Sequence, residues 1–280
     1  MTSHVLNFQI ENWLNQYANG VQEREITYAP PSGFPLGTNR AFTICARILI
    51  PILNSIGKPQ WEGVENIPSS GPAIVASNHM SYVDVLFLSQ FLFQHGRAPR
   101  YIGKKSLFEI PIIGGILYAA EQIPVDRESQ DAGKALDHAI ASLKVGHLIG
   151  VYPEGTLTRD ENLWPMVAKT GVARLAIITQ TPVIPVVAWG TQRVLPPYSK
   201  KLHLWPRTKI IFRAGAPINL SAWYGNFEDQ EALVEATAHV MKILTTMLEE
   251  IRGEKAPEFP FDPHKSDLPR TGNFKKRKKQ

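Results

Sequence analysis

The chain has 280 residues, 44% of them hydrophobic, which is enough for one large domain with a sizeable core. Its single cysteine, Cys45, excludes an internal disulfide and any metal site built from several cysteines. A net charge of +5 at pH 7 and a pI near 9.2 indicate an anionic partner, which a membrane surface or a nucleic acid would provide.

Residues 1–57 read as one N-terminal segment. They are polar at first and then rich in proline and glycine from Pro30 to Gly37, which predicts a short helix and a loop on the outside. Residues 41–56 are mostly apolar but contain Arg47 and Pro51, and a spanning helix needs roughly 20 apolar residues. We therefore expect a helix that faces a membrane or covers the core. No secretory signal is expected, because the first 20 residues lack a basic start followed by an apolar stretch.

The next pattern is a strand followed by a helix, with a polar turn between them. Residues 73–77 are an apolar strand, and the apolar run from Val83 to Phe93 is typical of a buried helix start. His79 lies in the turn, where α/β folds place their chemistry. The Asp84 carboxylate can hold one ring nitrogen of His79, which makes the other nitrogen a general base. Ser81 and Asp84 also have the spacing of a capping box, which needs no function.

A second strand carries a second polar turn. Residues 130–145 have apolar side chains at helical spacing and end at Gly146. The apolar strand 148–152 follows, and Glu154 emerges at its carboxyl end. The glycine after it, Gly155, would let backbone N–H groups approach an anion closely. Residues 183–189 form another buried strand, and this alternation of strands and helices predicts an α/β sheet.

The C-terminal third contains one more strand, one long helix and a tail. The strand covers 208–213, and the helix covers about 228–252 with Gly253 as its stop. Its predicted core stripe consists of Leu233, Ala236, Val240, Ile243, Met247 and Ile251. Residues 253–280 have the composition of a disordered basic tail. Its end, 275–279, resembles a nuclear-localisation or nucleic-acid patch, but attraction to anionic lipid at about 1 kcal/mol per basic residue also explains it.

Four sequence blocks, taken in order, resemble the glycerophospholipid acyltransferases, in particular those that act on 1-acylglycerol 3-phosphate. Residues 78–84 fit the pattern Asn-His-x-Ser-x-x-Asp. The other blocks are 103–127, which includes Gly103-Lys104-Lys105 and ends in Ile123-Pro124-Val125-Asp126-Arg127, then Tyr152-Pro153-Glu154-Gly155-Thr156, and Val183-Ile184-Pro185-Val186. Together they span about residues 58–222. The resemblance implies a single α/β domain over 58–252, with a mixed, mostly parallel sheet flanked by helices.

The resemblance also implies a reaction. An acyl chain would pass from acyl-CoA or acyl carrier protein to the sn-2 hydroxyl of 1-acylglycerol 3-phosphate, giving phosphatidic acid in phospholipid biosynthesis. His79 would take the hydroxyl proton, and Asp84 would orient the imidazole of His79. The enzyme would need no cofactor beyond its co-substrate and no metal, and it would lie at the cytoplasmic face of the cell membrane. An acyltransferase of the same superfamily that acts on glycerol 3-phosphate, another lysophospholipid or a lyso-aminolipid is the alternative.

The acceptor-binding residues come from the second and third blocks. Arg127 and Lys105 would hold the phosphate, since guanidinium offers a planar fork of donors. Glu154, Gly155 and Thr156 would help to bind the acceptor.

The chain departs from its relatives at two positions. Many relatives have arginine directly after Glu-Gly-Thr, where this chain has Leu157, with Arg159 two positions further on. The identity of a third phosphate-binding cation is therefore open. Relatives often have glycine where this chain has Glu121, ahead of the segment that ends in Arg127.

Other classes of protein fit less well. A serine hydrolase built on Ser81, His79 and Asp84 lacks a Gly-x-Ser-x-Gly elbow. A nucleic-acid-binding protein would explain the charge but leaves the four blocks unexplained, and no binding module is recognisable. The sequence contains no His-Glu-x-x-His pattern that would indicate zinc.

The oxyanion of a tetrahedral intermediate would need N–H donors, either from the turn after residues 169–171 or from the helix start after His79.

Overall fold

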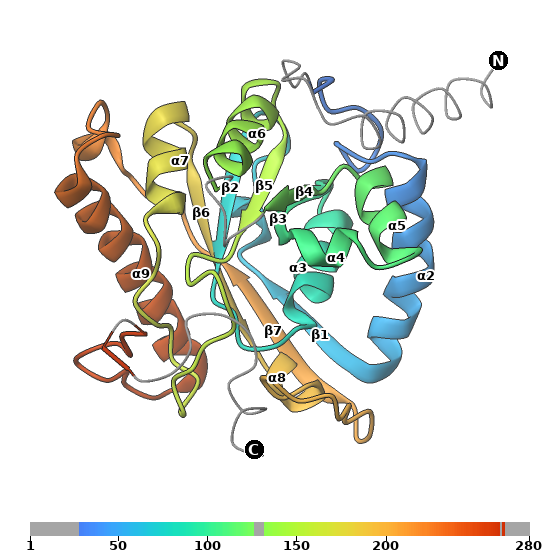
Figure 1. Cartoon of the computed structure of the whole chain (residues 1–280). Coiled ribbons are helices and arrows are strands. Elements are labelled where there is room, and N and C mark those ends of the chain that lie inside the picture. The colour runs from blue at the N-terminus through green and yellow to red at the C-terminus, as the bar shows by residue number, and fades with distance from the viewer. Residues whose placement is uncertain (1–27, 126–131, 264, 267–280) are drawn as a thin grey trace.

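The computed structural model describes residues 28–125, 132–263 and 265–266 (Figure 1). In this part of the chain the strands form one seven-stranded sheet in the order β1-β7-β6-β2-β5-β3-β4. The elements are α2 (Arg40–Ile56), β1 (Gly57–Glu62), the 3-10 turn η1 (Val64–Asn66), β2 (Ala73–Ser77), α3 (Asp84–Gln94), β3 (Pro99–Lys104), α4 (Lys105–Phe108), α5 (Ile113–Ala119), β4 (Ile123–Val125), α6 (Ala132–Lys144), β5 (Leu148–Val151), α7 (Gly171–Thr179), β6 (Val183–Trp189), α8 (Thr191–Val194), β7 (Thr208–Ala214), the 3-10 turn η2 (Ser221–Trp223) and α9 (Gln230–Arg252).

The sheet is mixed but mostly parallel, which confirms the predicted fold class. Strands β2 to β6 all run in one direction. Strand β7 is antiparallel to β6, and the edge strand β1 pairs in parallel with β7. The carboxyl ends of five parallel strands therefore meet at one edge, which is where ligands bind in open α/β sheets.

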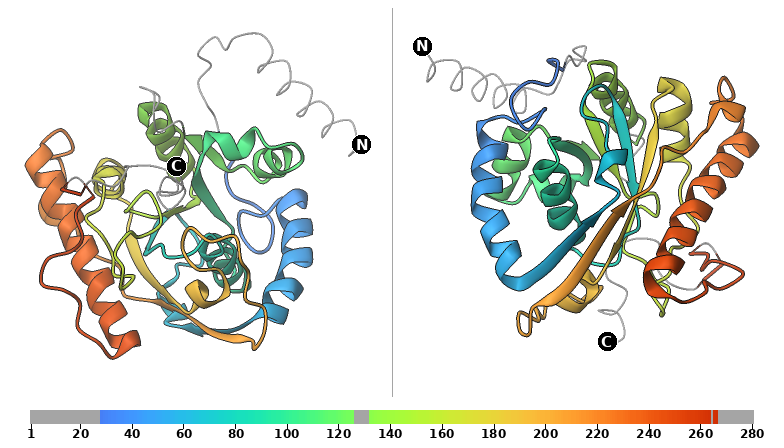
Figure 2. Two further views of the ribbon diagram at one scale, coloured as in Figure 1. Left: turned by 60° about the horizontal axis from the view of Figure 1, so that its bottom comes forward. Right: turned by 180° about the vertical axis from the view of Figure 1, so that it is seen from behind.

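Helices cover both faces of the sheet (Figures 1 and 2). In β2, Ile74 and Ala76 join the core cluster under α6, α7 and α9, whereas Ala73 and Val75 join the cluster under α3. Side chains alternate between the faces of a strand, so a strand covered on both sides is apolar at every position. This is why β2, β5 and β6 are visible in the sequence as continuous apolar runs.

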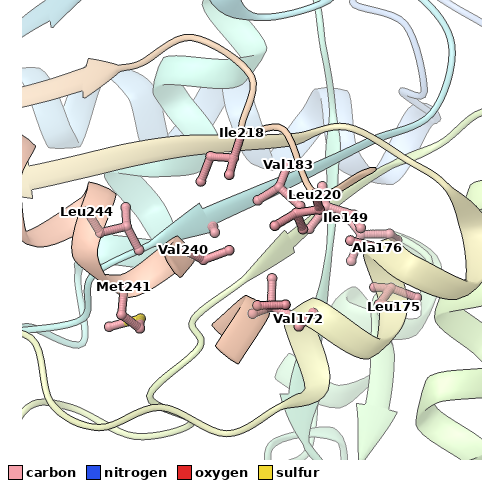
Figure 3. Close-up of a cluster of buried hydrophobic side chains, with 14 of the residues drawn as sticks. Ile149, Val172, Leu175, Ala176, Val183, Ile218, Leu220, Val240, Met241 and Leu244 are labelled. Atoms are coloured by element: carbon pink, nitrogen blue, oxygen red, sulfur yellow. The ribbon is translucent and has the colours of Figure 1, made fainter. Parts of the chain in front are cut away.

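The long C-terminal helix, α9, packs its buried stripe against β6 and α7, as Figure 3 shows in close-up for Val240, Met241 and Leu244. The predicted stripe is only partly right. Leu233, Ala236 and Val240 are buried as expected, but the stripe continues through Leu244 and Leu248, while the predicted Ile243, Met247 and Ile251 are partly buried. Because a helix has 3.6 residues per turn, two adjacent rows of apolar side chains run along α9. The elements that pack against the helix decide which of the two rows is buried.

Helix α2 covers part of the core and also exposes an apolar face. Ala46 and Leu53 are buried, and the helix contacts α3, α5 and β1. Ile44, Ile48 and Ile52, spaced four residues apart, point outward with at least half of each side chain exposed. Within the described ranges no helix has both the length and the hydrophobicity to cross a bilayer.

Several predictions fall on residues outside the described part. These are the N-terminal helix before residue 28, the phosphate ligand Arg127 and the basic run 275–279. The beginning of the predicted tail is described and has defined contacts after the cap at Gly253. The Ala256 N–H donates to the Glu249 carboxylate at 2.8 Å, and the Phe261 carbonyl accepts from the Val167 N–H at 3.0 Å.

Candidate active site

The loop between β2 and α3 is fixed to the neighbouring strand β6 by its first residue. Asn78 is buried, and its amide nitrogen donates to the carbonyl of Ala188 at 3.1 Å. The Ala188 N–H in turn donates to the Asn78 side-chain oxygen at 2.8 Å. The Asn78 side chain thus extends the hydrogen bonding of the sheet beyond the end of β2 and holds His79 at the carboxyl edge.

The imidazole of His79 and the carboxylate of Asp84 lie together, as the sequence predicts. Nδ1 of His79 is 3.0 Å from Oδ2 of Asp84. The same carboxylate oxygen accepts the backbone N–H groups of Met80 at 2.7 Å and Ser81 at 2.8 Å. Asp84 is fully buried, whereas the His79 side chain is 14% exposed. An ionised Asp84 acts only as an acceptor, so Nδ1 carries the proton and Nε2 is left free to accept one.

Ser81 has a structural role. Its hydroxyl donates to the carbonyl of Leu195 at 2.7 Å and accepts the Val83 N–H at 3.3 Å. The hydroxyl proton is therefore directed at a backbone carbonyl and not at His79, which argues against a serine nucleophile. Half of the predicted capping box is present, since Asp84 receives the Ser81 N–H.

An aromatic ring that was not predicted as a site residue packs on the imidazole. The Tyr152 ring stacks on His79 with centroids 4.1 Å apart and an angle of 23° between the planes. Burial, followed by the nearby Tyr101 and Asp84, raises the pKa of Tyr152 well above its usual value. The ring stays neutral and restricts the rotation of the imidazole. No sequence signal separates this tyrosine from an ordinary core aromatic.

The Glu154 side chain holds the His79 loop in place through hydrogen bonds to backbone N–H groups. One carboxylate oxygen accepts the His79 N–H at 3.1 Å and the other accepts the Met166 N–H at 3.0 Å. The side chain is almost completely buried. Burial raises the pKa of Glu154 to about 8, although the two backbone N–H donors act in the opposite direction. Both oxygens thus have partners within the protein, whereas the family resemblance implies that Glu154 helps to bind the acceptor.

The turn after Glu154 approaches a basic side chain. Gly155 has a φ of 69°, which glycine adopts without strain, and Thr156 is half-buried. A Cβ at position 155 would lie 3.4 Å from Cδ and Cε of Lys169, so this lysine packs along the turn. Leu157 and Arg159 are both buried. The sequence places Lys169 only at a glycine-containing turn, whereas a tertiary contact brings it beside Gly155.

In the second block, residues 103–127, the predicted phosphate ligand Lys105 lies at the surface. Lys105 is exposed at the start of α4, directly after the carboxyl end of β3. Glu121 adopts a left-handed conformation with a φ of 55°, which explains why glycine suits this position. Its carboxylate pairs with the guanidinium of Arg100, which is almost completely buried. This chain therefore uses Glu121 as the counter-ion of a buried arginine.

One of the two candidate sources of N–H donors for an oxyanion is already occupied. The N–H groups of Met80 and Ser81, just before α3, both bind Asp84. In the described residues no group of three or more His, Cys, Asp or Glu side chains has an arrangement that would hold a metal ion.

The fold and the site together define an α/β protein with a histidine–aspartate pair at the carboxyl edge of its parallel strands. Comparison with known proteins agrees. The family model described as Acyltransferase matches residues 58–189. The chain is 33% identical to the chloroplastic 1-acyl-sn-glycerol-3-phosphate acyltransferase of Arabidopsis thaliana over 54% of this chain and 41% of that protein. It is 27% identical to the 1-acyl-sn-glycerol-3-phosphate acyltransferase of Bacillus subtilis over 75% of this chain and 100% of the relative.

A solved structure shares the fold. The crystal structure of the 1-acyl-sn-glycerophosphate acyltransferase from Thermotoga maritima matches with a TM-score of 0.60 and 24% identity, over 77% of this chain and 81% of that one. The match spans only about two fifths of the plant relatives from Brassica napus and Arabidopsis thaliana, at 39% and 41% of their length. These matches confirm the resemblance predicted from the four blocks: the chain is similar to the 1-acyl-sn-glycerol-3-phosphate acyltransferases.

Proposed function

We propose that the protein transfers an acyl chain from a thioester to the sn-2 hydroxyl of 1-acylglycerol 3-phosphate, giving phosphatidic acid. The observation that carries the proposal is the 3.0 Å contact between His79 and Asp84, which fixes the imidazole tautomer. The names of the relatives from Arabidopsis thaliana and Bacillus subtilis support the same acceptor. The donor is acyl-CoA or acyl carrier protein, and we propose a peripheral position at the cytoplasmic face of the cell membrane.

The chemical step needs one base and no acyl-enzyme. Nε2 of His79 takes the proton of the acceptor hydroxyl as the oxygen attacks the thioester carbonyl carbon. The tetrahedral intermediate then collapses, the carbon–sulfur bond breaks, and the departing thiolate takes the proton from the imidazolium. Asp84 stabilises that imidazolium, and the stacked Tyr152 ring keeps it in place.

The acceptor phosphate requires cations near this base. We propose Arg127 and Lys105 for this role, with Gly155 and Thr156 lining the acceptor side. Lys105 follows β3 and Gly155 follows β5, and these neighbouring parallel strands end at the same edge of the sheet. The phosphomonoester would thus be held beside His79 by charge-assisted hydrogen bonds, which are roughly twice as strong as neutral ones.

A panel assay tests the proposal. The purified protein is offered 1-acylglycerol 3-phosphate, glycerol 3-phosphate, other lysophospholipids and a lyso-aminolipid, each with acyl-CoA and with acyl carrier protein. We expect the highest kcat/KM with 1-acylglycerol 3-phosphate and at least roughly 100-fold slower product formation by a folded His79→Ala control. A preference for another acceptor would overturn the assigned substrate while leaving the acyl-transfer chemistry in place.

A further inference from the structure

The segment between α8 and β7, residues 195–207, lies at the same edge of the sheet as His79. It follows the carboxyl end of β6, which pairs with β2. Two hydrogen bonds fasten its first part to the active site: Ser81 donates to the carbonyl of Leu195, and the Tyr198 hydroxyl donates to the carbonyl of Leu157, both at 2.7 Å. The rest of the segment protrudes beyond the ends of β1 and β7 (Figures 1 and 2).

The protruding part exposes large apolar side chains. Leu202 is 51% exposed, Leu204 is 48% exposed and Trp205 is 85% exposed, all within four residues. Large apolar side chains gathered in this way on an exposed surface indicate an interaction site. Tryptophan is the side chain most typical of the interface between lipid headgroups and acyl chains.

Cations surround these apolar side chains. Lys200, Lys201 and Arg207 are exposed on either side of them. Asp and Glu are absent from residues 162–227, a stretch that contains eight Lys and Arg residues. The Arg207 guanidinium donates to the carbonyl of Gly57 at 2.9 Å, which places the segment beside the end of α2. An apolar tip flanked by basic residues, in a stretch of chain without acidic residues, is complementary to an anionic bilayer.

We propose that residues 200–207 form a membrane-docking loop that inserts Leu202, Leu204 and Trp205 into an anionic phospholipid bilayer, with Lys200 and Lys201 against the lipid phosphates. The docking loop would bring His79 to the surface that holds a lipid acceptor, and in this respect it rests on the proposed function. An acidic carrier protein would explain the cations but would leave the exposed tryptophan and leucines without a role.

Vesicle binding tests the docking loop directly. The full chain is sedimented with vesicles of phosphatidylglycerol and phosphatidylcholine, and with vesicles of phosphatidylcholine alone. We expect the double variant L202S/W205S to bind both kinds of vesicle at least tenfold more weakly. The variant K200Q/K201Q should bind anionic vesicles more weakly and phosphatidylcholine vesicles as the wild type does. Val234→Ser, which changes an apolar side chain that is 52% exposed on α9 across the sheet, is the matched control and should bind like the wild type.

A second measurement does not depend on a disruptive variant. The chain has six tryptophans, so the fluorescence difference between the wild type and Trp205→Phe reports on Trp205. We expect this difference spectrum to shift to the blue and to resist iodide quenching when anionic vesicles are added. An unshifted spectrum would overturn the proposal.

Two further outcomes would also overturn it. One is unchanged vesicle binding by K200Q/K201Q together with a lower kcat/KM for acyl carrier protein in solution, which would identify an acidic protein as the partner. The other is unchanged vesicle binding by L202S/W205S together with a change from dimer to monomer, which would identify a second copy of the chain. Vesicle binding needs no turnover, so a failure of the proposed reaction in the panel assay would leave this result intact.

Discussion

The loop that carries His79 and the segment that follows β3 differ in how far their side chains are buried. Around His79, the side chains of Asn78, Asp84 and Glu154 are all buried, and each binds backbone groups. After β3, Lys105 and the apolar side chain of Ile112 are exposed. The base is thus preorganised, as electrostatic catalysis requires, whereas the side expected to receive the acceptor is open to it.

The largest effect on activity is expected when the general base, His79, is removed. We expect His79→Ala to lower turnover by roughly 100-fold or more, the factor that general bases typically supply. Folding should survive, because Asp84 keeps the N–H groups of Met80 and Ser81 as hydrogen-bond donors when the imidazole is removed. Turnover is compared at saturating substrate, and far-UV circular dichroism checks the fold. Near-normal turnover in a folded variant would exclude His79 as the base.

The next test separates support of the loop from acceptor binding. In Glu154→Gln one oxygen becomes an NH₂ group, which would face the N–H of His79 or Met166 and displace the loop. A displacement of about 1 Å costs up to roughly 100-fold in rate, so we expect a fall in kcat of roughly 10- to 100-fold. The KM for the acceptor should change little. A higher KM at unchanged kcat would instead show that Glu154 binds the acceptor, as the family resemblance implies.

On the acceptor side, Arg127→Ala should raise the KM for a phosphomonoester acceptor and leave that for the thioester donor nearly unchanged. The loss of a charge-assisted hydrogen bond, about 1.5–3 kcal/mol, corresponds to at least roughly a tenfold rise. Steady-state kinetics with each substrate varied in turn provides the contrast. Equal effects on the two substrates, or none on either, would mean that Arg127 does not hold the phosphate.

The raised pKa of Glu154 predicts how stability depends on pH. With a folded-state pKa of about 8 and an ordinary value of 4.5, the folded protein keeps a proton that the unfolded chain releases between these pH values. The contribution of Glu154 to the free energy of unfolding is therefore complete below pH 4.5 and decreases as pH rises towards 8. Urea unfolding at pH 5 and 8 should show that the wild type loses stability relative to Glu154→Gln. A difference that stays constant across this range would contradict the raised pKa.

The smallest effect is expected at the basic end of the chain. Deleting Lys275 to Gln280 should weaken binding to anionic vesicles and make the remaining binding less sensitive to salt, because salt screens exposed charges. Turnover on a short-chain, water-soluble acceptor should stay the same. The effect should be smaller than that of L202S/W205S, since the tail adds no apolar contact. Vesicle binding that the deletion does not alter would show that the tail takes no part in it.

Whether a strand can be predicted from the sequence depends on its position in the sheet. Strands β2, β5 and β6 lie inside the sheet and are apolar at nearly every position, so their pattern reveals them. Strand β1 was missed because it is an edge strand with the polar sequence Gly-Lys-Pro-Gln-Trp-Glu. Strand β3 was missed because it contains Arg100, whose burial depends on its pairing with Glu121. Glu121 lies 21 residues from Arg100 along the chain, so no local sequence pattern indicates that the two side chains pair.

The sequence by itself determined the family resemblance through its four blocks. It also determined the pairing of His79 with Asp84, because these residues are five positions apart and one turn of chain brings them together. The tertiary structure alone decided the contacts that hold this pair. Glu154 is 75 residues from His79, and Ala188 is 110 residues from Asn78. Such contacts depend on the order in which strands join the sheet. A pattern of apolar residues encodes the faces of each strand but not its neighbours.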